Sequence, residues 1–277
     1  MLKQEITKLH PPKTKGNTAV NWVLVSLSLP MLLSSLGTSI ANVSLPTLAE
    51  AFNASFQQVQ WVVIAYLLSI TTLVVSIGRL GDMVGRRQLL LIGILLFTGA
   101  SAICGVAPSL WLLIVARAAQ GLGAAAMMAL TLTFVGETVA KEKFGSAMGL
   151  LGTMSAIGTA LGPSLGGVLI AGLGWRSIFL VNLPLGIFTF LLARRYLPAD
   201  FNVRTSLAAG FDYVGTLLLA LTLGAFALAM TVGRGNFGTV NLALLALATG
   251  SVILFIRVEA RTTTPLIQMV MFRRRIL

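Results

Sequence analysis

Eight long apolar runs decide what this chain can fold into. Each approaches the roughly 20 residues that a helix needs to cross a hydrocarbon core about 30 Å thick. They lie near residues 21–43, 59–78, 88–106, 110–135, 146–171, 175–193, 213–232 and 239–256. Only 10% of the 277 residues are charged, whereas an ordinary soluble domain is about 25% charged. The sequence therefore predicts an all-α membrane protein with about eight spans.

Lysine and arginine are distributed unevenly between the ends of these runs. If the amino terminus is cytoplasmic, only Arg176 and Arg234 fall outside and Arg117 falls within a span, while every other Lys and Arg faces the cytoplasm. This asymmetry is what the positive-inside rule requires. The net charge of +12 is thus explained by topology, and a nucleic-acid partner is not expected. We expect a multi-pass protein of the cell inner (plasma) membrane with a cytoplasmic amino terminus.

The side chains needed for most catalytic and metal sites are scarce. Cys104 is the only cysteine and His10 the only histidine. Disulfides, a Cys/His zinc site and a Cys/His or Ser/His nucleophile are thereby excluded. We expect no enzyme, no catalytic residue, no cofactor and no bound metal.

Composition along the chain predicts five segments. Residues 1–18 form a polar, basic cytoplasmic leader, and residues 19–195 hold six spans. Residues 196–212 form a cytoplasmic connector, and residues 213–258 hold two linker spans. Residues 259–277 end in a basic stretch that looks like the truncated entrance to a ninth span.

The fifth run is unusually rich in glycine. Small residues recur about four apart along it, at Gly145, Gly149, Gly152, Gly158, Gly162, Gly166 and Gly167. This spacing lets helix backbones approach closely in lipid. Pro163 removes one backbone donor and can bend the helix. A tightly packed, slightly kinked structural helix is the alternative to a functional role.

Two polar features interrupt the apolar pattern. Between the second and third runs, the segment from Gly78 to Arg87 combines three glycines, which permit a tight turn, with Asp82 among three arginines that can bind its carboxylate. In the fourth run, Arg117 lies in an otherwise apolar helix. Arginine at mid-membrane is costly and normally faces a cavity or a partner, unless it lies close enough to the outer surface to snorkel.

These segments resemble the signatures of the major facilitator superfamily, and within it of the fourteen-span drug:proton exporters. Gly78 to Arg87 matches the loop signature between spans 2 and 3, and Arg117 to Ala125 matches the span 4 signature. The segment from Gly158 to Gly167 looks like the span 5 signature of antiporters. The resemblance implies a major-facilitator-type six-helix bundle followed by two additional transmembrane helices.

The resemblance also implies roles for individual residues. The loop residues Gly78, Arg79, Gly81, Asp82, Gly85, Arg86 and Arg87 would form a cytoplasmic charge latch. The polar residues Arg117, Gln120 and Glu137 would line the cavity or assist proton transfer. A helix bend would involve Gly158, Gly162, Pro163, Gly166 and Gly167. Substrate contacts would come from Asn42, Trp61, Tyr66, Met127 and Met128, with plain packing as the alternative for the last four.

The sequence departs from the family pattern at Gly37. Drug:proton exporters usually carry an aspartate at this place in span 1, and acidic residues are absent from the interiors of all eight runs. Proton coupling would therefore use Glu137, a carboxylate outside this chain, or nothing. In addition, only one of the two six-span halves that rock around a midplane site is present in this sequence.

The resulting hypothesis is a secondary active transporter that exports drug-like or other small organic solutes by alternating access, here apparently incomplete. Its partners would be a small-molecule substrate, the lipid bilayer, protons, and a second six-span half or a homodimer. The alternative is a truncated, non-transporting membrane subunit or fragment that pairs with a separately encoded second half. A channel is disfavoured because no ring of charged or carbonyl-lining filter residues can be seen.

Overall fold

The structure, a computed structural model, describes residues 17–198, 213–231 and 238–259. The side chains of residues 17–20, Val75, Arg79, Asp82 and Tyr213 are outside this description, as are the leader, the connector and the final basic segment. The described residues are helical, without strands, and eight helices or helix pairs are long and apolar enough to cross a membrane. The predicted number of spans is confirmed.

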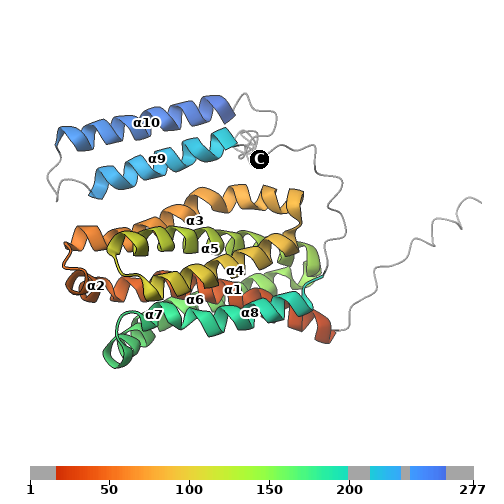
Figure 1. Cartoon of the computed structure of the whole chain (residues 1–277). Helices are drawn as coiled ribbons and strands as arrows, with labels where there is room; N and C mark the ends of the chain where they lie inside the picture. The colour runs from red at the N-terminus through yellow and green to blue at the C-terminus, as the bar shows by residue number, and fades with distance from the viewer. Residues whose placement is uncertain (1–16, 199–212, 232–237, 260–277) are drawn as a thin grey trace, which may run out of the picture.

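Six spans form a bundle (Figure 1). In chain order its helices are α1 (Asn17–Val43), α3 (Phe56–Val84), α4 (Arg86–Val106), α5 (Leu110–Thr138), α6 (Lys141–Leu173) and the consecutive pair α7 (Ser177–Leu180) and α8 (Asn182–Tyr196). The short helix α2 (Leu45–Ala51) lies between the first two spans.

Local signals fix where several spans begin. Ser55 and Gln58 form a reciprocal capping box at the start of α3, which satisfies two backbone donors that the first turn leaves free. The Ser109 side chain accepts a hydrogen bond from the backbone N–H of Leu112 and so caps α5. Lipid cannot hydrogen-bond to backbone groups, so these caps matter most at the membrane boundary.

The bundle is organised around two closely packed helix pairs, α1 with α6 and α3 with α5. In both cases a span from the first three packs on a span from the second three, as expected for two three-span repeats related by a pseudo-twofold axis. Helix α5 also packs on α4, and α8 packs on α1 and α4. Helix α5 is therefore the most central of the six spans.

Glycines allow α6 to approach α1 and α5 to approach α4. At the α1–α6 contact, a Cβ on Gly158 would lie 2.6 Å from the Leu32 carbonyl oxygen. At the α4–α5 contact, a Cβ on Gly123 would lie 2.6 Å from the Gly93 carbonyl oxygen. Real side chains do not tolerate such distances to backbone atoms, so these contacts require glycine. The predicted close approach is confirmed for Gly158, Gly162 and Gly166, whereas Gly145, Gly149, Gly152 and Gly167 have open space beside them.

The two linker spans, α9 (Tyr213–Thr231) and α10 (Thr239–Glu259), lie together on one side of the bundle (Figure 1). Helix α9 packs on α3, and α10 packs on α9. The Ser76 and Thr216 hydroxyls share a 2.8 Å hydrogen bond that joins α3 to α9. The Asn241 amide donates to the Ala229 carbonyl oxygen over 2.7 Å and joins α10 to α9. The predicted architecture, a six-helix bundle followed by two additional helices, is confirmed.

One prediction about local structure is wrong. The segment from Gly78 to Arg87 is not a three-glycine turn, because α3 continues through Gly78 and Gly81 to Val84 and α4 begins at Arg86. Only Gly85, with φ of 107°, adopts a conformation that favours glycine. A Cβ on Gly81 would instead collide with the Leu130 side chain on α5. In this segment, Gly85 therefore allows the sharp turn between α3 and α4, and Gly81 allows the close contact of α3 with α5.

Candidate functional site

Arg117 on α5 is buried in the centre of the bundle, with an exposed fraction of 0%. Its Nε donates to the Val62 carbonyl oxygen over 3.0 Å, and its Nη1 donates to Gln120 Oε1 over 2.6 Å. The guanidinium carbon lies 4.0 Å from the centroid of the Tyr66 ring and 5.9 Å from that of Phe179. Cation–π contacts of this kind are strongest when desolvated, so the cation is held by dipoles and a ring.

The hydrogen bonds continue from Arg117 to the third span. Gln120 Nε2 donates to the Ser101 hydroxyl over 2.6 Å, and that hydroxyl donates to the Phe97 carbonyl oxygen over 2.7 Å. Gln120 and Ser101 are both completely buried. A buried polar chain whose members satisfy one another orients each side chain strongly. Spans α3, α4 and α5 are thus joined through Arg117.

Tyr66 extends the same cluster to the first span. Its hydroxyl donates to the Ser34 carbonyl oxygen on α1 over 2.9 Å, and the residue is completely buried. A Cβ on Gly37 would lie 3.4 Å from that hydroxyl oxygen and 3.3 Å from Phe97 Cζ. A carboxylate in place of Gly37 would therefore enter the interior beside the ring that Arg117 covers.

Arg117 has no carboxylate partner among the described side chains, and its Nη2 makes no hydrogen bond there. A buried cation normally pairs with a carboxylate or hydrogen-bonds on all sides. Here a backbone carbonyl, an amide and two aromatic rings take that place. Among the described residues, the Arg117 guanidinium is therefore held by backbone and side-chain dipoles and by aromatic rings.

Two expectations for Arg117 are corrected. The guanidinium does not snorkel to the outer surface, because it is completely buried and bonded inside the bundle. Neither Arg117 nor Gln120 lines an open cavity in this conformation, since both have an exposed fraction of 0%. Their expected part in proton transfer stays a prediction.

The expected substrate contacts are scattered rather than gathered in one pocket. Tyr66 and Met127 belong to the buried core, and Met128 packs against that core. Trp61 is half-buried on α3, while Asn42 is exposed near the end of α1. Asn42 donates to the Thr38 carbonyl oxygen of its own helix over 3.3 Å. For Tyr66 and Met127 the packing alternative describes the structure better.

At the end of the bundle where α3 joins α4, charged side chains connect the spans. Arg86 forms an ion pair with Glu137 near the end of α5. The Arg87 guanidinium donates to the carbonyl oxygen of Arg194 at the end of α8. These contacts join the start of α4 to two other spans. The side chains of Arg79 and Asp82, the remaining charged members of the expected latch, lie outside the described residues.

Sequence reasoning missed three participants in the central cluster: Ser101, the Val62 carbonyl oxygen and Phe179. Ser101 interrupts an apolar stretch of the third span, and this signal could have identified it as an interior polar residue. A backbone carbonyl and one phenylalanine among 14 carry no such signal.

Comparison with known proteins identifies relatives over almost the whole chain. Residues 27–271 match the family model of the Major Facilitator Superfamily. Multidrug resistance protein Stp of Mycobacterium tuberculosis is 38% identical over 254 residues, covering 90% of this chain and 47% of that protein. Riboflavin transporter RibZ of Clostridioides difficile is 36% identical over 214 residues, covering 77% of this chain and 46% of that protein. The chain spans about half the length of these relatives.

Solved structures agree on the fold. A bacterial homolog of the human lysosomal transporter Spinster, in an inward-facing and occupied conformation, superposes with a TM-score of 0.61 at 17% identity and covers 91% of this chain and 64% of that one. The human organic anion transporter MFSD10 superposes with a TM-score of 0.59, also at 17% identity, covering 84% of this chain and 60% of that one. Together with the matching family model, the helix pairing and the eight spans, these likenesses show that the chain is an integral membrane protein that belongs to the major facilitator superfamily.

Proposed function

We propose that this chain is the first half, with two linker helices, of a secondary transporter that exports drug-like or other small organic solutes by alternating access. The sequence signatures and the relatives named for multidrug resistance or multidrug transport support this class of substrate. The proposed direction, export, rests on the resemblance of Gly158 to Gly167 to the span 5 signature of antiporters.

The observation that carries the proposal is an uncovered face of α6. Opposite the glycines that pack on α1, exposed small residues follow one another along the helix: Gly149, Thr153, Ala156, Ala160, Ser164 and Gly167. Lipid-facing surfaces do not need such small side chains, whereas helix–helix interfaces in membranes are enriched in them. We infer that a second six-span half packs or slides along this face during transport. A homodimer could supply the same surface.

The charged joint at the cytoplasmic end supports a gating role. The Arg86–Glu137 ion pair connects α4 to α5, and the Arg87 contact connects α4 to α8. In the proposed cycle this joint holds the cytoplasmic ends of the first half together in the outward-open state, with Asp82 and Arg79 as further members. The alternative is a non-transporting subunit that needs a separately encoded second half.

The orientation of the chain can be tested by labelling. In a Cys104→Ala background, a cysteine at Ala51 after the first span should react with an impermeant thiol reagent applied to intact cells. A cysteine at Lys141, before α6, should react only after the membrane is opened. Both positions are exposed in the structure, so their reactivity should differ only because they lie on opposite sides of the membrane. The unsubstituted chain is the control, because Cys104 is buried and should not react; a reversed pattern would contradict the cytoplasmic amino terminus.

Proton coupling can be tested by two substitutions, one that removes a carboxylate at Glu137 and one that introduces a carboxylate at Gly37. In everted vesicles with an imposed pH gradient, a transporter completed with a second half should lose proton-driven ethidium transport when Glu137 becomes Gln. Glu137 forms an ion pair with Arg86, and Gln removes the carboxylate that the proposal assigns to coupling while keeping the side-chain size. Gly37→Asp places a carboxylate beside Tyr66 and is expected to change the pH dependence only if span 1 takes part in coupling. If neither substitution alters proton-driven transport, this half carries no coupling site.

A further inference from the structure

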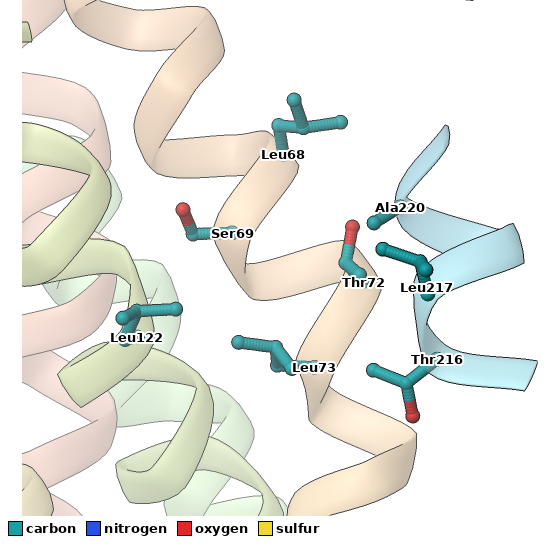
Figure 2. Close-up of a pocket in the computed structure, with 8 residues that line it drawn as sticks. All are labelled: Leu68, Ser69, Thr72, Leu73, Leu122, Thr216, Leu217 and Ala220. Carbon is teal, nitrogen blue, oxygen red and sulfur yellow. The ribbon is translucent and has the colours of Figure 1, made fainter. Parts of the chain in front are cut away.

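A pocket of about 400 Å³ lies where the linker helices meet the bundle. Helix α3 contributes Leu68, Thr72 and Leu73, and Leu122 of α5 and Ala220 of α9 face them from either side (Figure 2). Its volume is within the range of small-molecule sites, and such sites combine mostly apolar walls with a few polar groups. The pocket and the Arg117 cluster share no side chain.

Two contacts between α3 and α9 frame the pocket along its length. Toward the cytoplasmic side, Ser76 and Thr216 share their 2.8 Å hydrogen bond. Toward the outer side, a Cβ on Gly224 would lie 4.0 Å from Leu68 Cδ2. Because the two helices touch at both places and Ala220 between them is small, the pocket is left between the contacts.

Thr72 provides the polar group. Its hydroxyl is buried and makes no hydrogen bond in the described structure. The other hydroxyls on this part of α3 are bonded, since Ser69 donates to the Ala65 carbonyl oxygen over 2.9 Å and Thr71 donates to that of Leu67 over 2.9 Å. An unsatisfied hydroxyl in an apolar environment is unfavourable, and a ligand that accepts a hydrogen bond from the Thr72 hydroxyl would remove that penalty.

The depth of the pocket narrows the choice of ligand. Thr72 lies near the middle of α3 (Phe56–Val84), and Ala220 lies roughly 10 Å along α9 (Tyr213–Thr231) from its start at the usual rise per residue. Phospholipid headgroups and ester carbonyls stay outside the hydrocarbon core, so only acyl chains reach this depth. An acyl chain offers no acceptor for Thr72. A compact solute dissolved in the bilayer and carrying one acceptor suits both the apolar walls and the hydroxyl.

We propose that the α3–α9 pocket binds a small apolar organic molecule with one hydrogen-bond acceptor, which enters from the bilayer and is held by Thr72. Leu217, which is 70% exposed, marks the side open to lipid. This site involves a linker helix and is distinct from a midplane site between two six-span halves. It does not require the second half to be present, so it can be tested on this chain alone.

Benzophenone is a suitable probe because it is apolar, carries a single carbonyl acceptor and forms covalent adducts with nearby C–H bonds under ultraviolet light. The purified 277-residue chain in phosphatidylcholine liposomes should show saturable labelling of peptides that contain residues 68–73 and 216–220. Ala220→Phe, which fills the pocket, should abolish the saturable part. Thr72→Val preserves the side-chain shape and should raise the half-saturating concentration about five-fold, as expected for one lost hydrogen bond.

Thr71→Val is the matched control, because it makes the same change at the preceding residue. The Thr71 hydroxyl is exposed and already donates a hydrogen bond to its own helix. This substitution should leave the half-saturating concentration unchanged. Diphenylmethane, which lacks the carbonyl, should compete more weakly than unlabelled benzophenone in the parent and equally well in Thr72→Val. If Ala220→Phe does not fold, the comparison of the two threonine variants still decides the question.

Three results would overturn the proposal. Non-saturable labelling spread over all spans would mean that no site exists. Equal half-saturation in the Thr72→Val and Thr71→Val variants would remove the role of the hydroxyl. Suppression of labelling by raising the phospholipid-to-protein ratio, beyond simple dilution of the probe, would assign the pocket to acyl chains.

Discussion

Gly158→Ala is expected to destabilise the chain by about 1–3 kcal/mol, the usual range for overpacking a tight interior. The added Cβ would lie 2.6 Å from the Leu32 carbonyl oxygen and 3.0 Å from the Leu36 nitrogen. Both are backbone atoms of α1, so no side chain can rotate away and the α1–α6 pair must separate. Thermal unfolding of the purified chain in detergent, followed by circular dichroism, measures the change.

Gly152→Ala on the same helix is the matched control and should act in the opposite direction. Gly152 is exposed and a Cβ there meets nothing within 4 Å. Alanine is a better helix former than glycine by roughly 0.5–1 kcal/mol, so stability should rise slightly or stay unchanged. If both substitutions lowered the melting temperature equally, close packing of α1 on α6 would not explain the glycines.

Arg117→Met is expected to abolish transport while changing the stability of the fold only slightly. Methionine approximates the length of the arginine side chain without its charge. It loses the hydrogen bonds to Val62 and Gln120, but it also removes the cost of burying a cation whose Nη2 is unsatisfied among the described residues. The unfolding free energy should therefore change by less than about 1.5 kcal/mol. In a transporter completed with a second half, substrate efflux should nevertheless be lost, because the side chain expected to assist proton transfer no longer carries a charge or a hydrogen-bond donor.

Arg117→Ala provides the comparison, since it removes the same charge and also leaves a cavity. In both variants Gln120 loses its partner at Oε1, but only alanine leaves the space over the Tyr66 ring empty. We expect destabilisation of about 3 kcal/mol or more. If the Met variant transported at the parent rate, Arg117 would be a packing residue and its proposed part in transport would be wrong.

The architecture could be predicted because lipid imposes simple requirements. Each span must be long, apolar and helical, so eight runs in the sequence became eight spans in the structure. The close contacts at Gly158 and Gly162 could be anticipated for the same reason, because helices in membranes approach through small residues. The pattern does not tell which glycines are used, since Gly149 and Gly158 look alike in sequence and only the second meets a neighbour.

The candidate site was less predictable because it depends on packing between distant segments. That Arg117 lies inside the bundle rather than on a cavity wall follows from Tyr66, Val62 and Phe179, which come from two other helices. The sequence did not show that the chain turns at Gly85 and not at the other two glycines. Gly78 and Gly81 lie within α3, which its packing against other helices stabilises. The pocket beside Thr72 depends on the placement of α9, which no local motif encodes.

The central claim is that this chain acts as one half of an alternating-access pair, and substrate flux in proteoliposomes tests it most directly. Ethidium movement would be measured for this chain alone, for the second half of the Mycobacterium tuberculosis relative alone, and for both together after confirming that they co-purify. We predict saturable flux only for the combination, and its loss when Arg117→Met is introduced into this chain. Saturable flux by this chain alone, or none from a co-purified pair, would contradict the account.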